Sequence, residues 1–278
     1  MKKILCAALA LSIFLISCGS HQSASGHVSA APHNSPAKEI VCWGDSMTSG
    51  YGASIAVITS GRSKYNISYL SYPEILHALT GMDTYNFGVP GATSEEIAIM
   101  QGGIVPDQDL SMYSTIDYSI IEQAKNHTGD ILVLEIGSNG GWDDYDELTA
   151  QYGAMIAHSD CSEYIIIGDT DDPQNSVDSN VVQQTEDDAE SGIGTNDTAW
   201  EQALREAFGS HFINMRAFMI DNGLALAGLE PTEADIEAAQ YGNISVQLRS
   251  DWTHFNSYGY YVQAVGVYQK GQQLGYWD

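Results

Sequence analysis

Residues 39–46 read EIVCWGDS, an apolar run that ends abruptly in a glycine, an aspartate and a serine. A short apolar run that stops at a tight turn is typical of a buried strand. In open α/β sheets, ligands bind beyond the carboxyl ends of the strands. The stretch therefore predicts a buried first strand, and it places Ser46 at the edge of the sheet where ligands bind.

Apolar runs and helical periodicities alternate along the rest of the chain. The expected strands cover residues 84–87, 131–136, 164–167 and, more weakly, 212–215, and the expected helices cover residues 71–79, 93–100, 145–158, 198–208 and 258–274. Strands that alternate with helices predict an α/β fold, in which helices cover both faces of a mostly parallel sheet of about five strands.

The N-terminus has the composition of an export signal. Lys2 and Lys3 precede an apolar run over residues 4–16, interrupted only by a serine. This run is too short to span a bilayer comfortably, and small residues follow it. We therefore expect a signal peptide over residues 1–17.

The end of this signal resembles a bacterial lipobox, because residues 15–18 read LISC. The resemblance implies that Cys18 is lipidated after cleavage, and that the exported protein is anchored to the cell envelope on its periplasmic or outer face. An ordinary signal peptide with a nearby cysteine is the alternative. Residues 18–37 would form the lipidated cysteine and a flexible tether, followed by a single domain over residues 38–278.

The chain is strongly acidic, with 36 Asp and Glu residues, 10 Lys and Arg residues and a formal net charge of −26. Such a surface repels nucleic acids, which excludes them as partners. Acidic residues gather in segment 169–197, where we expect a solvated loop and no metal. A calcium site through Asp169, Asp171 and Asp172 is the alternative, although the glycine of an EF-hand loop is missing.

Two of the four cysteines lie in the expected domain. Cys42 falls in the first apolar run, which predicts a buried thiol, and Cys161 lies in a polar stretch before a later strand. Their spacing does not imply a disulfide, so we expect both to be free.

Three residues from opposite ends of the domain have the chemistry of an activated serine. A serine hydroxyl needs a base within hydrogen-bond reach before it can attack an ester carbonyl, and His254 can accept that proton. Asp251 lies three residues earlier, close enough to accept the other imidazole N–H and fix the tautomer. A backbone carbonyl is the alternative partner for the His254 ring.

Four short motifs follow expected strands or precede the last expected helix. They are GDSM at 44–47, GVPGAT at 88–93, GSN at 137–139 and DWTH at 251–254. In this order they resemble the four blocks of the SGNH, or GDSL-type, hydrolases, and the resemblance extends across essentially the whole domain. It implies a flavodoxin-like, three-layer α/β/α fold and ester hydrolysis without a cofactor. The absence of Gly-x-Ser-x-Gly from the sequence argues against the α/β-hydrolase fold.

The resemblance also implies an oxyanion hole. Its donors would be the backbone N–H groups of Ser46 and Gly91 and the side-chain amide of Asn139, with Gly88 as a weaker alternative to Gly91. Loss of one such donor typically lowers the rate about 100- to 1,000-fold. One position departs from the family pattern, because Gly140 follows Asn139 where many members carry aspartate.

The stretch GATSEEIA at 91–98, followed by QGG at 101–103, resembles SGNH members associated with carbohydrate deacetylation, and this resemblance implies an acylated carbohydrate substrate. Tyr51, Trp142 and Trp252 could form a platform for a sugar ring or line an acyl pocket, and core packing is the alternative for some of them. We expect hydrolysis of a carboxylic ester through an acyl-Ser46 intermediate, with an O-acetylated carbohydrate or polysaccharide as the favoured substrate. A lysophospholipase or short-chain lipid esterase is the first alternative, and a catalytically silent carbohydrate-binding module is the second.

Overall fold

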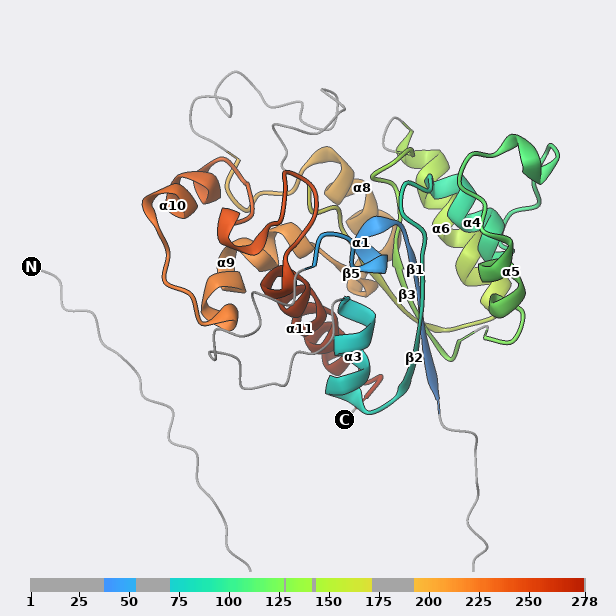
Figure 1. Cartoon of the computed structure of the whole chain (residues 1–278), viewed down its shortest axis with the longest axis horizontal. Helices are drawn as coiled ribbons and strands as arrows, with labels where there is room; N and C mark the ends of the chain where they lie inside the picture. Colours follow the sequence, from blue (N-terminus) through green and yellow to red (C-terminus); the bar gives the residue numbers. More distant parts are fainter. Residues whose placement is uncertain (1–37, 54–70, 128, 142–143, 172–192, 278) are drawn as a thin grey trace, which may run out of the picture. The chain divides into compact units, whose positions relative to one another are not determined.

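The computed structural model describes residues 38–53, 71–127, 129–141, 144–171 and 193–277. Five strands form one parallel sheet in the order β2-β1-β3-β4-β5 (Figure 1). Their bounds are Glu39–Gly44 for β1, Asp83–Gly88 for β2, Ile131–Glu135 for β3, Glu163–Ile167 for β4 and Phe212–Ile213 for β5. The expectation of a mostly parallel sheet of about five strands is confirmed.

Helices pack on both faces of the sheet and complete three layers. One face is covered by α3 (Tyr72–Thr80), α9 (Met215–Ala227) and α11 (Ser257–Leu274), and the other by α4 (Ser94–Gln101), α5 (Tyr118–Ala124), α6 (Tyr145–Ser159) and α8 (Ala199–Phe208). Strand β1 explains the uninterrupted apolar run, since Ile40 and Cys42 point into one core and Val41 and Trp43 into the other. A strand that is buried on both faces has no polar alternation to show.

The start of α4 follows directly from its sequence. The Thr93 hydroxyl accepts a hydrogen bond from the Glu96 backbone N–H at 3.2 Å, and the Glu96 carboxylate accepts one from the Thr93 backbone N–H at 3.0 Å. This reciprocal pair is a capping box, which satisfies two N–H groups that lack partners inside the helix.

Several elements were not expected from the sequence. They are the four-residue α1 (Ser46–Ser49), α5, α9, α10 (Glu233–Gln240) and the 3₁₀ turns at Leu110–Met112, Gly209–His211 and Val246–Leu248. The strand expected over residues 212–215 is shorter than expected: β5 stops at Ile213, the Asn214 side chain caps the next helix, and Met215 begins α9.

Both cysteines of the described chain are free, with Cys42 buried and Cys161 partly buried. Cys18 and the expected signal and tether over residues 1–37 lie outside the described residues. Within the described part of the chain, none of the helices combines the length and apolar character that crossing a membrane requires.

A buried ion pair joins α8 to α9. Arg216 and Glu201 each expose only 1% of their side chains, and Nε and Nη2 of Arg216 each lie 2.8 Å from a Glu201 carboxylate oxygen. The guanidinium also donates to the carbonyls of Gly194, Asn196 and Gly242. Arg216 thus ties the segments before α8 and after α10 to α9.

We expect Arg216→Met to destabilise the fold by about 3–5 kcal/mol, because it leaves the Glu201 carboxylate buried without its counter-charge. Chemical denaturation measures the loss. The double variant Arg216→Met/Glu201→Gln should be distinctly more stable than Arg216→Met alone. Equal stabilities for the two variants would show that the ion pair is not the source of the effect.

Candidate active site

Ser46 lies in a sharp turn between β1 and α1. Strand β1 ends at Gly44, Asp45 caps the next turn by accepting a hydrogen bond from the Met47 backbone N–H at 2.9 Å, and Ser46 is the first residue of α1. The turn packs closely on β2, since a Cβ atom on Gly88 would lie 2.2 Å from the Ser49 nitrogen. The sequence therefore needs glycine at position 88 to let α1 approach the sheet.

His254 and Asp251 lie in a compact turn ahead of α11. One Asp251 oxygen accepts hydrogen bonds from the backbone N–H groups of Thr253 at 2.9 Å and His254 at 2.7 Å. The Ser250 N–H donates to the His254 carbonyl at 2.9 Å. These short-range bonds fix the conformation of the turn itself.

The turn brings its two side chains into line with Ser46. The Ser46 hydroxyl lies 3.0 Å from His254 Nε2, and His254 Nδ1 lies 2.9 Å from the nearer Asp251 oxygen. Partial burial favours a neutral Asp251, but the hydrogen bonds from the His254 backbone and ring outweigh it and lower the pKa of this carboxyl. An ionised Asp251 can hold the ring with its Nδ1 protonated and leave Nε2 free to accept the Ser46 proton.

Asp45, the residue before Ser46, holds the side chain of Asn139. The Asn139 amide donates one hydrogen bond to Asp45 at 2.9 Å, which leaves its second N–H unused by that contact. The Ser46 N–H stands at the first turn of a helix, where backbone N–H groups have no intrahelical partner. Both groups are therefore able to donate to a developing negative charge.

The two candidate glycines differ in what their N–H groups do. The Gly88 N–H donates to the Asn86 side chain at 2.9 Å, so it is already engaged. Within the described chain, the Gly91 N–H makes no intramolecular hydrogen bond. Because Gly44 lies beside Gly88 in the sheet, the segment after β2 starts level with the Ser46 turn. The geometry thus favours Gly91 over Gly88.

Gly140 cannot easily be replaced by the aspartate of many family members. Its φ is +150°, a region that side chains disfavour, and a Cβ atom there would lie 3.1 Å from the Thr93 side chain. Its carbonyl accepts a hydrogen bond from the Ser94 N–H at 3.1 Å. The Asn139 side chain is supported instead by Asp45. This contact was not predicted from the sequence. Its one signal was a polar residue, Asp45 itself, between the first strand and Ser46.

Asp45 carries an electrostatic penalty in this position. Its carboxyl is 1% exposed, and burial raises its pKa to about 6. Glu135, at the end of β3, is also buried, and burial raises its pKa well above the usual range. Ionised Asp45 is therefore less stable in the folded protein than in water, and its two hydrogen bonds only partly compensate.

The expected aromatic residues have different environments. Tyr51 and Trp252 are each 58% exposed, and the Tyr51 ring centroid lies 4.6 Å from that of His254. The buried Tyr260 hydroxyl donates to the Tyr51 carbonyl at 2.6 Å and so fixes the backbone behind the ring. Phe255 is fully buried and belongs to the core. Trp142 lies outside the described residues.

The acidic segment is described only at its two ends, and Asp172 lies outside the described residues. Asp169 accepts a hydrogen bond from the Ser138 hydroxyl at 3.0 Å, and burial raises its pKa to about 6. This residue therefore belongs to the polar contacts behind the Asn139 turn rather than to a solvated loop. Among the described residues, no group of three His, Cys, Asp or Glu side chains has the arrangement of a metal site.

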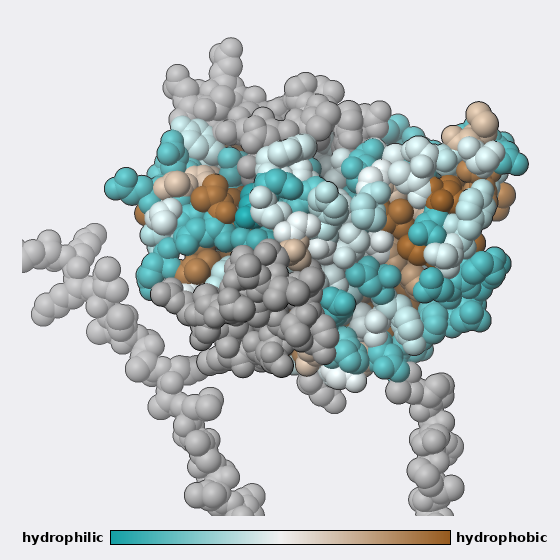
Figure 2. Space-filling model, viewed as in Figure 1, coloured by the Kyte–Doolittle hydropathy of each residue, from teal (hydrophilic) through white to brown (hydrophobic). Residues whose placement is uncertain are grey.

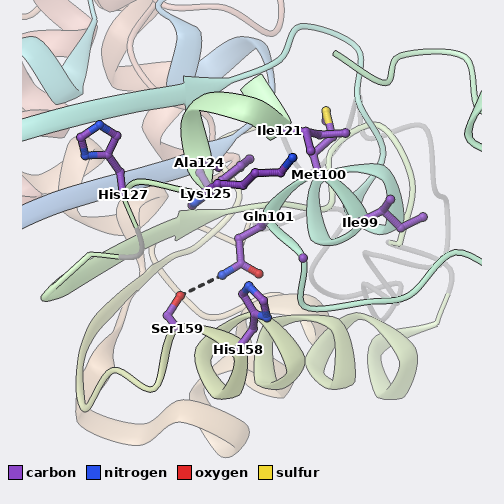
Figure 3. Close-up of a pocket in the computed structure, with 11 residues that line it drawn as sticks. Ile99, Met100, Gln101, Ile121, Ala124, Lys125, His127, His158 and Ser159 are labelled. Carbon is purple, nitrogen blue, oxygen red and sulfur yellow. Dashed lines mark hydrogen bonds between the residues drawn. The ribbon is translucent and has the colours of Figure 1, made fainter. Parts of the chain in front are cut away.

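A separate cavity of about 360 Å³ lies between the carboxyl ends of α4, α5 and α6 (Figure 3). Gln101 lines the cavity and donates to the Ser159 hydroxyl at 2.8 Å (Figure 3). It also donates to the Met155 carbonyl at 3.1 Å. The Ser46, His254 and Asp251 side chains do not line it.

On the face shown in Figure 2, hydrophobic surface gathers over α4 and α5 and again around α10.

Comparison with known proteins identifies a family over most of the domain. The family model of GDSL-like lipases and acylhydrolases matches residues 42–262, a range that includes Ser46, Asp251 and His254. No curated protein shows significant similarity to the chain.

Three solved structures illustrate the structural similarities. A G-D-S-L family protein from Desulfitobacterium hafniense is 11% identical, with a TM-score of 0.46 over 84% of this chain and 99% of that one. A catalytic variant of an acetylxylan esterase from Geobacillus stearothermophilus is 16% identical, with a TM-score of 0.45 over 84% and 93%. A phospholipase A1 from Streptomyces albidoflavus is 13% identical, with a TM-score of 0.39 over 85% and 99%.

We expect Asp45→Asn to become more stable relative to the parent protein as the pH rises from about 4 to about 7. Because burial raises the pKa of Asp45, the folded state favours the protonated carboxyl. The resulting contribution to the free energy of unfolding is fully present below the ordinary pKa of 3.8 and is lost as the pH rises to about 6. The difference corresponds to roughly 3 kcal/mol, which the variant does not lose. Urea denaturation of both proteins across this range measures it.

Asp251→Asn is the matched control, because the pKa of Asp251 is lowered rather than raised. Its contribution to stability is present above the ordinary pKa of 3.8 and is lost as the pH falls below it, so the control should stay nearly constant between about pH 4 and 7 and change with the opposite sign only at lower pH. A pH-independent difference for Asp45→Asn would contradict the burial of an ionisable carboxyl at position 45.

Proposed function

The chain belongs to the GDSL-like lipase/acylhydrolase family, and we propose that it is a serine esterase that works through an acyl-Ser46 intermediate. The observation that carries the proposal is the continuous hydrogen-bonded chain from the Ser46 hydroxyl through His254 to Asp251. A protein that only binds its ligand needs no proton path to a serine. This arrangement therefore disfavours a catalytically silent binding module.

The proposed reaction has two halves that share one base. His254 Nε2 accepts the Ser46 proton as the hydroxyl oxygen attacks the ester carbonyl, and the protonated ring then gives that proton to the departing alcohol. Water repeats the sequence on the acyl-serine and releases the acid. Asp251 stays ionised throughout and stabilises the protonated ring.

Each half passes through a tetrahedral oxyanion that needs fixed donors. We assign this role to the N–H groups of Ser46 and Gly91 and to the free amide hydrogen of Asn139. Because Asp45 already holds the other Asn139 hydrogen, the amide does not have to be oriented when charge develops.

An O-acetylated carbohydrate is the proposed substrate class. Tyr51, whose ring packs against that of His254, and Trp252, two residues before His254, are exposed and offer flat apolar faces of the kind on which sugar rings pack. A short-chain or lysophospholipid ester is the second candidate. It is favoured by exposed apolar side chains, chiefly Val105 and Met112, in the segment between α4 and α5.

We also propose that the protein acts outside the cytoplasm, held to a membrane by lipid on Cys18. A multiply acylated cysteine anchors stably, whereas one chain binds only marginally. Cys18→Ser should therefore move the protein from the membrane fraction to the soluble fraction, as immunoblotting of the two fractions would measure. An unchanged membrane fraction would rule out the lipid as the anchor.

The soluble domain should hydrolyse p-nitrophenyl acetate faster than the butyrate or octanoate, and Ser46→Ala should lower kcat by about 10⁴-fold or more. A fluorophosphonate probe should label the parent protein and not the variant. Preference for octanoate would move the assignment to lipid esters. Equal, negligible rates and absence of labelling for both proteins would refute the serine-esterase proposal.

A further inference from the structure

Hydrogen bonds within the turn that carries Asp251 and His254 fix its conformation, but its position relative to Ser46 depends on contacts with other segments. The Thr253 and His254 N–H groups donate to Asp251, and the Ser250 N–H donates to the His254 carbonyl, so all these bonds join residues within the turn. Such bonds set the shape of the turn and not its distance from Ser46. The Ser46–His254 contact spans 208 positions of sequence, so the turn must be placed by longer-range interactions.

Arg249 makes such an interaction with its side chain. One guanidinium nitrogen, Nη1, donates to the carbonyls of Thr253 at 3.0 Å and Trp252 at 3.3 Å. The other, Nη2, donates to the carbonyl of Thr170 at 2.6 Å. A planar guanidinium with several donors in a fixed geometry can bridge two backbone segments in this way, and a lysine cannot reproduce it fully.

The two segments differ in burial. Thr170 is buried and follows β4 by three residues, and β4 is paired with β3 on one side and β5 on the other. Trp252 and Thr253 immediately precede His254 in an exposed turn. Arg249 therefore ties the residues next to the base to a buried residue three positions beyond the end of β4.

The base of the turn reinforces the same placement. Arg249 and Phe255 form an antiparallel backbone bridge, and the guanidinium lies 5.5 Å from the centre of the buried Phe255 ring. The Asn256 side chain donates to the Arg249 carbonyl at 3.1 Å and also caps α11. The guanidinium therefore contacts the turn through Trp252 and Thr253, the segment after β4 through Thr170, and the core through the Phe255 ring.

We propose that Arg249 is a positioning residue for the acid–base turn, an inference that rests on the proposed esterase function. It acts through His254 by setting the distance between Nε2 and the Ser46 hydroxyl, and it does not itself contact the substrate. A displacement of the order of 1 Å at a reacting group can lower the rate about 100-fold. Affinity for p-nitrophenyl acetate should change little, because none of the groups that Arg249 contacts is a proposed oxyanion donor and this ester has no sugar ring to pack on Trp252.

The test is Arg249→Ala with chemical rescue. We expect kcat for p-nitrophenyl acetate to fall about 100-fold with KM changed less than threefold, and the rate of fluorophosphonate labelling of Ser46 to fall in parallel. Guanidinium chloride, well below denaturing concentrations, should restore kcat severalfold and in a saturable manner by refilling the vacated position. Urea and sodium chloride at the same concentrations should not.

Arg205→Ala is the matched control. Arg205 binds the Asp197 carboxylate through two nitrogens and lies 5.2 Å from the Phe212 ring centre, so its loss removes a comparable set of contacts away from Ser46. This variant should lose thermal stability and keep kcat, without response to guanidinium. If Arg249→Ala folds poorly, Arg249→Lys provides the measurement, with an expected kcat between those of the parent and the inactive Ser46→Ala.

The outcomes separate the two proposals. An active parent with undiminished kcat in Arg249→Ala or Arg249→Lys, at whatever melting temperature, would overturn the role of Arg249 and leave the esterase proposal intact. A reduced kcat that guanidinium fails to raise, together with an equal loss in Arg205→Ala, would show general destabilisation and also overturn it. A parent protein that neither turns over esters nor reacts with the probe would refute the esterase proposal and, with it, this inference.

Discussion

The parallel pairing of β1 with β2 on one side and β3 on the other is the constraint on which the site depends. The register sets Gly44 beside Gly88 and Glu135, so three strands end at one level. The Gly44 carbonyl then accepts the Val89 N–H at 2.9 Å, which carries the pairing past the strand end. Everything that follows these strands, including the Ser46 turn, starts from a rigid edge rather than from a loop.

Asp45 makes two structural contacts at this sheet edge although its side chain is buried. Its carboxylate both caps α1 and holds Asn139, and it does so while almost fully withdrawn from water. A neutral residue there would relieve the desolvation but would lose one or both contacts. The site thus retains a group that is unfavourable for folding because two neighbouring elements are ordered by it.

The sequence predicted best where the signal was local. The run at 39–43 identified β1, and each motif that follows a strand lies at the sheet edge, because a parallel sheet collects its carboxyl ends there. α1 was missed because four residues are too few to show a helical period. α9 was missed because Arg216 interrupts its apolar face, and only the distant Glu201 makes that burial acceptable. The hydrogen bond from Arg249 to the Thr170 carbonyl could not be predicted for the same reason, because it joins residues far apart in sequence.

The distance along the chain between Ser46 and His254 also has a consequence for the order of folding during synthesis. The first group emerges early and the second only near the end, when α11 can dock between α3 and α9. Closing so long a loop is entropically costly and comes late in folding. A nascent or clipped chain that lacks His254 would therefore leave the Ser46 hydroxyl without this hydrogen-bond partner, so the contact itself would report that α11 has docked.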